Sequence, residues 1–384
     1  MVNSVLIKPA GPDCNLRCNY CFYRQKAAMF DATKGKTHRM SDKVLETLIR
    51  DCMQAGIRTF SWQGGEPTLM GLDFYRRAVE LEIRYGPPGA TVANALQTNG
   101  VLLDAQWARF LAEYRFLVGL SLDGPKRLHD VYRKDASGKG TFDRVMRAAK
   151  IMRDAGVEYN VLCLLNDRNV KEPEAVYDFL AQNEIYFMQF VPCVEPGTRR
   201  ADRAAGQKGS GSIEPAPFSI TPEQYGEFLV RVFDRWVEDF PNVSIRDFDD
   251  LLLLELGEMP GTCTTSERCG SYVVVEHNGD VFACDFFVVA RWRLGNILER
   301  PLGEIIQSAA VEEFARAKSD LGKTCKKCKF LQKCWGGCQK HRIVLDGKLT
   351  DPSYFCKSYK RLFAHAADTM PRLAEQIRER GYRR

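Results

Sequence analysis

Six short apolar runs alternate with stretches of helical periodicity between residues 4 and 196, and no other feature limits the possible folds as strongly. Six strand–helix units in series predict a parallel sheet with right-handed crossovers, either open or curved into a barrel. Because a closed barrel of this type needs eight units, six favour an α/β fold with a partial (β/α)6 barrel. The predicted strands are Ser4–Pro9, Thr59–Gln63, Ala93–Thr98, Phe116–Leu122, Glu158–Leu165 and Tyr186–Val191.

The composition changes after the sixth predicted strand and indicates where domains meet. Residues 197–217 are rich in Gly, Ser, Pro and charged residues, which predicts a flexible loop. A long helix follows, with Thr221 as N-cap and Gln224 completing a capping box. We therefore expect a barrel domain over 1–240, a cysteine-rich domain over 241–365, and a C-terminal helix or tail over 366–384.

The chain has 384 residues and 14 cysteines, although a core of this size needs no covalent staples. The N-terminal segment lacks the features of a secretory signal, and no apolar run reaches the roughly 18 residues of a membrane span. We therefore expect a cytoplasmic protein without a membrane partner, and a net charge of +6 gives no reason to expect nucleic acid. Because cytosolic thiols stay reduced, closely spaced cysteines predict metal or iron–sulfur ligation.

The first cysteine cluster follows the first predicted strand. Cys14, Cys18 and Cys21 have the spacing C-x3-C-x2-C. Three thiolates on one loop can hold three irons of a cubane cluster and leave the fourth iron without a protein ligand. An open coordination position is typical of a reactive metal centre. A structural zinc site with a distant fourth ligand is the alternative.

Motifs around these cysteines point to a family. CNLRCNYC resembles the cysteine motif of the radical S-adenosylmethionine (SAM) superfamily, and GGEP after the second predicted strand resembles its motif for the amino group of SAM. The chain further resembles the anaerobic sulfatase-maturating enzymes, through IKPAGPDCNLRCNYCFY, WQGGEPTLMGLDFY, LQTNG, FLVGLSLDGP, FACDFF, RLGNI and CKKC…CWGGC. These segments cover most of the chain, so the resemblance extends beyond the cysteine loop.

The resemblance implies that the open iron binds SAM, and that reductive cleavage of SAM yields a 5′-deoxyadenosyl radical able to remove hydrogen from an unactivated carbon. It assigns cofactor contacts to Tyr20, Gly64, Gly65, Glu66, Ser121, Arg133 and the backbone of Val194. Tyr23 and Gln63 match positions that line the substrate cavity, and plain packing beside the cluster is an equal alternative for Tyr23.

Eight further thiols lie toward the C-terminus and suffice for two fully ligated cubanes, which makes three 4Fe-4S clusters in all. Their spacing is tighter than that of most zinc ribbons, and two zinc sites are the alternative. The pattern resembles the SPASM extension with its two auxiliary clusters. By that resemblance, Cys263, Cys269, Cys284 and Cys338 hold one cluster, and Cys325, Cys328, Cys334 and Cys356 hold the other. Cys52, Cys163 and Cys193 are expected in structural positions.

Asp285 directly follows Cys284, and the resemblance implies that it is the base that takes the substrate side-chain proton, with an Asx-turn as the alternative. The implied reaction converts a Cys or Ser of an unfolded sulfatase segment, of the type C/S-x-P/A-x-R, into Cα-formylglycine. One hydrogen abstraction removes only one of the two electrons, so an auxiliary cluster would accept the other. Residues 325–342 contain six Lys or Arg and no acid, which suits an acidic electron donor such as flavodoxin or ferredoxin, although a solvated basic loop is an equal alternative.

Other functions stay open at this point. Another SPASM peptide modifier, such as a thioether-forming enzyme, is the nearest competitor. An electron-transfer protein with several clusters would leave GGEP and the barrel without a role. A zinc-stabilised binding module would contain no iron. The sequence does not decide between cysteine-type and serine-type sulfatases, and it names neither the electron donor nor the oligomeric state.

Overall fold

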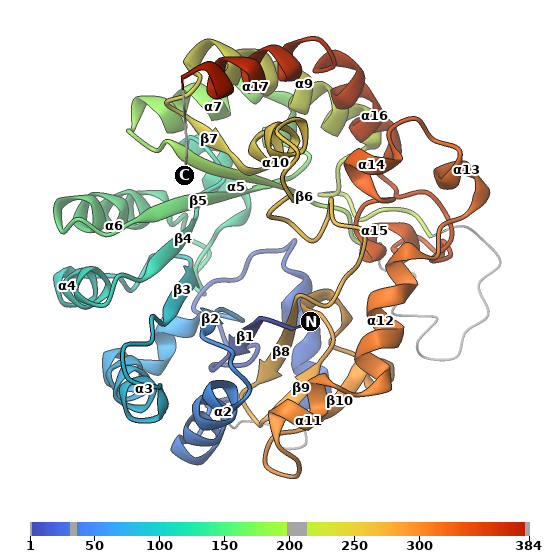
Figure 1. The fold of residues 1–384 in the computed structure, drawn as a ribbon. Helices are drawn as coiled ribbons and strands as arrows, with labels where there is room; N and C mark the ends of the chain where they lie inside the picture. The colour runs from blue at the N-terminus through green and yellow to red at the C-terminus, as the bar shows by residue number, and fades with distance from the viewer. Residues whose placement is uncertain (1, 31–36, 198–212, 381–384) are drawn as a thin grey trace. The chain divides into compact units, whose positions relative to one another are not determined.

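All six predicted strands are present, each within one residue of its predicted bounds. The computed structural model describes residues 2–30, 37–197 and 213–380 (Figure 1). The strands are β1 (Ser4–Lys8), β2 (Thr59–Trp62), β3 (Ala93–Thr98), β4 (Leu117–Ser121), β5 (Tyr159–Leu165) and β6 (Phe187–Pro192). The chain forms two compact units: the first comprises residues 1–122, 129–160 and 270–315, and the second 123–128, 161–269 and 316–384.

The first unit is built on a sheet in which β1, β2, β3 and β4 are neighbours and run parallel. Three later strands extend this sheet beyond β1: β8 (Tyr272–Glu276), β9 (Asp280–Phe282) and β10 (Arg293–Asn296). β8 pairs parallel with β1, placing Glu276 opposite Lys8, and β9 and β10 add in antiparallel orientation. The sheet therefore brings residues near 280 to the strand that precedes the cysteine loop.

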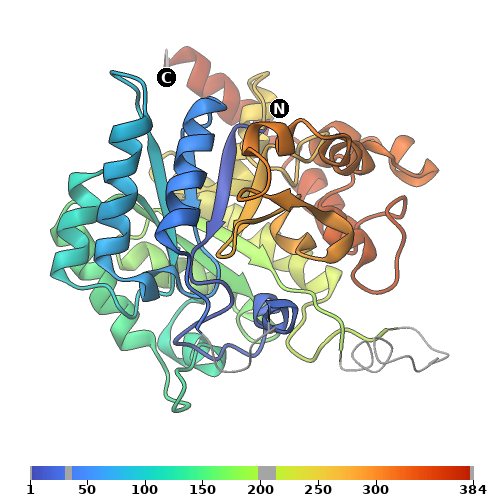
Figure 2. The ribbon, with the colours of Figure 1, turned by 90° about the horizontal axis from the view of Figure 1, so that it is seen from below.

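Four helices of the first unit lie on one side of its parallel strands: α2 (Asp42–Gln54), α3 (Leu72–Tyr85), α4 (Ala105–Glu113) and α6 (Phe142–Asp154). Figure 2 shows α2 beside α3 along the strands. The hydroxyl of Ser41 accepts a hydrogen bond from the backbone N–H of Val44 and caps α2, as its sequence predicts. Cys52 lies on the buried face of this helix, which confirms its expected core position.

The second unit contains β5, β6 and β7 (Ser244–Ile245) as parallel neighbours. Its larger helices are α7 (Pro173–Gln182), α9 (Pro222–Asp239), α10 (Arg246–Glu255), α16 (Cys356–His365) and α17 (Thr369–Glu379). The capping box of Thr221 and Gln224 at the start of α9 is present. α9 packs against α16, so the long helix after the predicted loop supports one of the cysteine-bearing helices (Figure 1).

Residues 270–315 lie within the first unit because β8 pairs with β1, although the sequence groups them with the C-terminal cysteines. The division into domains 1–240, 241–365 and 366–384 stays a prediction. The loop predicted over 197–217 falls largely on residues 198–212, which lie outside the described residues. Within the described ranges, no helix combines the length and apolar character needed to cross a bilayer.

Candidate active site

The cysteine loop directly follows β1 and carries all three thiols predicted for the first cluster. The backbone N–H of Leu16 donates to Cys14 Sγ at 3.3 Å. Burial raises the pKa of the Cys14 thiol to about 12, and the negative charges of Glu66, Cys18 and Cys21 act in the same direction. Three neighbouring thiolates therefore need a compensating positive charge, and an iron–sulfur cluster fits this donor set.

The GGEP segment lies against this loop, as the two motifs predict. The N–H of Gly65 donates to the carbonyl of Gly11 at 2.8 Å, and the N–H of Glu66 donates to the carbonyl of Asp13 at 2.8 Å. A side-chain carbon at Gly65 would lie only 1.9 Å from the carbonyl oxygen of Asp13. Only glycine permits this approach, so the local backbone explains the second glycine of the motif.

Glu66 is completely buried, and its carboxylate accepts hydrogen bonds from neighbouring protein groups. It accepts hydrogen bonds from the N–H of Thr68 (3.1 Å) and that of Asn99 (2.8 Å). The hydroxyls of Thr68 and Thr98 also donate to it, at 2.6 and 2.7 Å. Burial raises its pKa, and these hydrogen bonds oppose that effect. Glu66 thus shapes the turn after β2, and its predicted contact with SAM stays a prediction.

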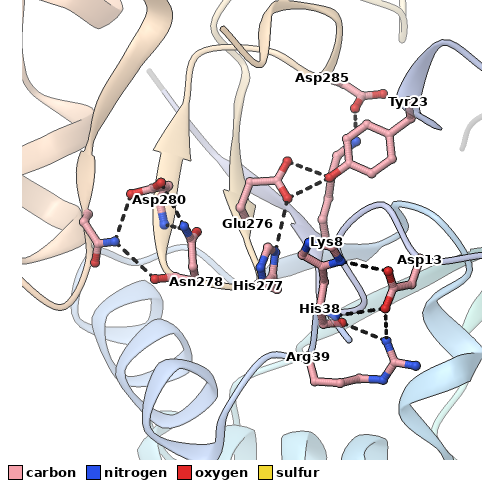
Figure 3. Close-up of polar contacts among 11 residues, drawn as sticks. Lys8, Asp13, Tyr23, His38, Arg39, Glu276, His277, Asn278, Asp280 and Asp285 are labelled. Carbon is pink, nitrogen blue, oxygen red and sulfur yellow. Dashed lines mark hydrogen bonds and ion pairs between the residues drawn. The ribbon is translucent and has the colours of Figure 1, made fainter. Parts of the chain in front are cut away.

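Asp13 anchors the other side of the cysteine loop, which the sequence analysis missed. Its carboxylate accepts from the backbone N–H of His38 at 2.9 Å and from the guanidinium of Arg39 at 2.8 Å (Figure 3). Burial disfavours its ionised form, but the hydrogen bonds from His38 and the charge of Arg39 lower its pKa overall. The carboxylate therefore ties the loop to the segment that precedes α2.

Two further contacts in the first unit involve predicted residues. The guanidinium of Arg133 lies 5.6 Å from the centre of the Tyr20 ring, which also packs edge-on against Tyr132. The amide of Gln97, at the end of β3, donates to Ser121 Oγ at 3.1 Å. Gln97 was not predicted as a site residue, although it lies in the LQTNG segment. Val194 lies in the second unit, where its carbonyl accepts a hydrogen bond from Lys340.

A buried ionic network surrounds the predicted base Asp285 (Figure 3). Lys8, the last residue of β1, forms an ion pair with Asp285. Its ammonium lies 3.5 Å from the centre of the Tyr23 ring. Tyr23 Oη is 2.7 Å from each carboxylate oxygen of Glu276, and both residues are buried. Burial and the charge of Glu276 raise the pKa of Tyr23, so it stays a neutral donor. Neither Lys8 nor Glu276 was predicted as a site residue.

The ionic network is also joined to the cysteine loop by aromatic residues next to Cys21 and Asp285. Phe22 and Phe286 pack with ring centres 4.9 Å apart, which joins the segment after Cys21 to the segment after Asp285. Gln63 is half-buried at the end of β2, and its backbone N–H donates to the carbonyl of Ile7 at 2.8 Å. The structure thus gathers most of the predicted active-site residues within the first unit.

Four C-terminal thiols, which we call the Cys325 group, surround one cavity of the second unit. The group comprises Cys325, Cys328, Cys334 and Cys356, the set predicted for one auxiliary cluster. The space that they line amounts to about 420 Å³, which includes the part open to solvent. Burial raises the pKa of Cys325, Cys334 and Cys356. Four soft thiol donors around one cavity fit an iron–sulfur cluster.

Three thiols of the second predicted set also lie together, and we call them the Cys338 group: Cys263, Cys269 and Cys338. Cys284 belongs to the first unit, where its sulfur is 3.3 Å from Tyr272 Oη, so its place in this set stays a prediction. Within residues 2–30, 37–197 and 213–380, no three His, Cys, Asp or Glu side chains are close enough to hold a single metal ion.

Comparisons with known proteins agree with the motifs. Residues 9–180 match the radical SAM superfamily, and residues 263–329 match the SPASM iron–sulfur cluster-binding domain. The cysteine-type anaerobic sulfatase-maturating enzyme of Clostridium perfringens is 38% identical over 98% of this chain and 99% of its own length. The serine-type enzyme of Bacteroides thetaiotaomicron is 38% identical over 97% of this chain and 91% of its own.

Solved structures extend the likeness to the fold. Native anSMEcpe with bound AdoMet and Cp18Cys peptide superposes with a TM-score of 0.86 at 37% identity, covering 97% of this chain and 99% of that one. Streptococcus suis SuiB, bound to its precursor peptide, has a TM-score of 0.62 at 17% identity and shares the fold alone, over 93% of this chain and 76% of that one. The expected α/β fold, a radical SAM domain followed by a SPASM domain, is therefore confirmed.

Proposed function

Because this chain belongs to the anaerobic sulfatase-maturating enzymes of the radical SAM superfamily, we propose that it oxidises a Cys or Ser of an unfolded sulfatase peptide to Cα-formylglycine. Its cofactors are SAM and iron–sulfur clusters. The observation that carries the proposal is the ion pair of Lys8 with Asp285 in the same compact unit as the cysteine loop. This contact supports the assignment of Asp285 as the base in substrate oxidation.

The reaction requires a hydrogen atom, a proton and a second electron to leave the substrate. Ser then becomes the aldehyde directly, whereas Cys becomes a thioaldehyde that water hydrolyses to the aldehyde with release of sulfide. When bound, the cluster and SAM supply the radical that removes hydrogen from the substrate Cβ. Asp285 takes the proton of the substrate thiol or hydroxyl on its carboxylate. Lys8 holds that carboxylate in place, while the hydrogen bonds of Tyr23 with Glu276 fix the aromatic face over which Lys8 lies. The second electron needs an acceptor, which the C-terminal thiol groups can bind.

Several residues of the first unit are positioned to hold SAM. Gly64 and Gly65 keep the turn after β2 against the cysteine loop. Tyr20 with Arg133, and Ser121 with Gln97, form polar pairs that suit the adenosine and carboxylate ends of SAM. Contacts from Glu66 and the Val194 backbone belong to the same proposal, as does a substrate cavity lined by Tyr23 and Gln63.

We assign three 4Fe-4S clusters to the 11 predicted thiols. Cys14, Cys18 and Cys21 hold the cluster that binds SAM. The Cys338 group with Cys284 holds one auxiliary cluster, and the Cys325 group holds the other. Two observations support this assignment. The Cys325 group lines one cavity, and Cys338 and Cys269 lie close enough to Cys263 for their charges to add to burial in raising its pKa.

An acidic protein such as flavodoxin or ferredoxin is the proposed electron donor. Of the six basic residues in 325–342, three are used internally: Lys333 pairs with Glu255, Lys340 pairs with Glu195, and Arg342 is buried. The other three are exposed close to the Cys325 group, and Lys360 lines its cavity. These exposed lysines are Lys326, Lys327 and Lys329. They form a smaller basic surface than the sequence alone indicates.

The decisive experiment is anaerobic incubation of the loaded protein with reductant, SAM and a short CxPxR peptide. We expect 5′-deoxyadenosine together with a peptide mass loss of about 18 Da, the change from Cys to the aldehyde. A matching SxPxR peptide would lose about 2 Da, and its rate relative to the Cys peptide identifies the preferred sulfatase type. A peptide with Ala at this position is the control. SAM cleavage with neither peptide changed would contradict the proposal.

A further inference from the structure

Two buried cations lie among the cysteine-bearing loops of the second unit. Lys318, near the end of α12 (Ala309–Ser319), is 0% exposed, and Arg342, in α15 (Gln339–Ile343), is 3% exposed. Such residues are almost never this deeply buried without a specific partner. In the part of the chain that the structure describes, neither is ion-paired with a carboxylate. Their charges are therefore available to other anionic groups, and the nearest candidates are thiolates.

Lys318 binds the loop that carries the first thiol of the Cys338 group. Its ammonium donates hydrogen bonds to the backbone carbonyls of Cys263 and Thr264, the latter at 3.0 Å. These bonds hold the positive charge at a fixed place in a dry interior. The ammonium therefore lies directly against the backbone of Cys263, a predicted cluster ligand.

Arg342 organises the turn that joins the two thiol groups. Cys334 belongs to the Cys325 group, and Cys338 to the other, with only WGG between them. The guanidinium donates to the carbonyls of Trp335 (2.8 Å), Gly336 (3.0 Å), Gly337 (3.4 Å), Lys318 (2.9 Å) and Leu349 (3.1 Å). Because the guanidinium binds the segment between Cys334 and Cys338, its charge lies beside both groups and does not distinguish one from the other.

Apart from the shared Arg342, the two thiol groups differ in the cation that lies beside each of them. The Cys338 group has Lys318, which is buried. The Cys325 group has Lys360, which is exposed and lines the cavity of that group. Water and salt screen an exposed charge, whereas a buried charge acts through a medium of low dielectric constant. Among the described residues, the buried cation Lys318 therefore distinguishes the Cys338 group from the Cys325 group.

We propose that Lys318 is a positioning residue for the auxiliary cluster of the Cys338 group and raises the reduction potential of that cluster above the potential of its neighbour. Adding an electron makes a thiolate-ligated cluster more negative, and a fixed buried cation stabilises the added charge. The electron that leaves the substrate would then reside preferentially on this cluster. The inference rests on the cofactor assignment made under the proposed function.

The test compares three variants of the full chain, each loaded anaerobically with iron and sulfide. Lys318→Gln removes the charge but keeps an N–H donor, Lys318→Arg keeps the charge, and Lys360→Gln is the matched control at the exposed lysine. The reduction potentials of the clusters are measured by redox titration followed by electron paramagnetic resonance, and iron is counted per chain. We expect Lys318→Gln to move one auxiliary potential to a more negative value, Lys318→Arg to restore it, and Lys360→Gln to move neither potential by as much.

Each result decides the inference. Potentials that are unchanged in Lys318→Gln, or shifted equally in the Gln and Arg variants, would overturn it. If Lys318→Gln loses about four of roughly 12 irons per chain while Lys318→Arg keeps them, the charge is needed to hold the cluster, which supports the inference. Loss of iron from both variants would assign Lys318 a packing role and overturn it. The measurement uses no peptide, so its failure is distinct from a failure of sulfatase peptide oxidation.

Discussion

The N-terminal cysteine loop and the C-terminal thiol groups have buried charges of opposite sign beside their sulfur atoms. Next to Cys14 lies the buried carboxyl of Glu66, whose negative charge raises the pKa of the thiol. Next to Cys269 lies buried Lys318, and next to Cys325 lies Arg342, whose charges act in the opposite direction. A nearby carboxylate disfavours an added electron and a nearby cation favours it. The first site thus suits a centre that gives electrons away, and the others suit acceptors.

The two regions also hold their loops by different means. Backbone hydrogen bonds to GGEP and the carboxylate of Asp13 fix the N-terminal loop. Cationic side chains bound to carbonyl oxygens fix the C-terminal loops. Carbonyl-rich irregular loops need donors, and a buried Arg supplies up to five of them. The difference suggests that each region can be disturbed separately.

Removing one thiol in each region should distinguish the role of the N-terminal cysteine loop most clearly from that of the C-terminal thiol groups. We expect Cys14→Ala to abolish SAM cleavage, because the loop would then lack a ligand for the cluster that binds SAM. Cys325→Ala should retain SAM cleavage but yield little formylglycine, because an electron acceptor is lost. 5′-Deoxyadenosine and peptide product are measured in the same reaction. Cys52→Ala, at a buried thiol of α2, is the control and should retain both activities. Equal loss of SAM cleavage in Cys14→Ala and Cys325→Ala would show that the regions are not separable.

A second separation lies within the first unit, between radical formation and proton removal. Asp285→Asn should lower formylglycine formation by about 10²- to 10⁴-fold, because the substrate proton loses its acceptor. Lys8→Met should have a smaller effect of about tenfold, with Lys8→Arg recovering part of it, because Lys8 acts by holding Asp285. The ratio of 5′-deoxyadenosine to formylglycine should rise in Asp285→Asn and Lys8→Met. An unchanged ratio would mean that the ion pair only stabilises the fold.

The close backbone approach at Gly65 gives a third, smaller effect. Gly65→Ala would force a methyl group against the carbonyl of Asp13 and displace the turn from the cysteine loop. We expect SAM cleavage to fall by ~10- to 100-fold, since small displacements at a reacting site are costly. Gly303→Ala is the matched control, because its new methyl group would meet only Ala55 at 3.9 Å. Similar activity of the two variants would show that the turn tolerates displacement.

How much of the fold and of the candidate site the sequence could predict depends on how far apart the interacting residues lie along the chain. The six strands were predictable because each has its own apolar pattern and turn signal, and the C-x3-C-x2-C loop because its ligands are adjacent. The pairing of Lys8 with Asp285 spans 277 residues and arises only because β8 joins β1. Lys318 likewise has an ordinary local sequence, and Asp13 lies in the cysteine motif without any sign of its partners His38 and Arg39. Their roles come from burial and from partners that only the folded chain brings near.

A last prediction separates Glu82, a buried carboxyl in α3, from Glu66, the buried carboxyl beside the cysteine loop. Glu82 in α3 is 5% exposed, and burial raises its pKa to about 7 while the hydrogen bond from Asn94 opposes this shift. Its folded-state pKa therefore lies above its unfolded value of 4.5, so the folded protein binds the extra proton between these pH values. Stability should fall as pH rises from 4.5 to 7, by roughly 3 kcal/mol, and then become independent of this group.

Glu82→Gln should abolish this part of the pH dependence, because a neutral amide replaces the titrating carboxyl. The measurement is urea-induced unfolding of the parent and the variant at pH 5 and pH 7.5, compared as a difference between the two proteins. SAM cleavage should be unchanged, since Glu82 contacts Asn94 and not the cysteine loop. A variant that keeps the parental pH slope would show that Glu82 is already ionised in the folded protein. Of these two buried carboxyls, Glu66 is the one whose charge affects the pKa of a cluster thiol, that of Cys14.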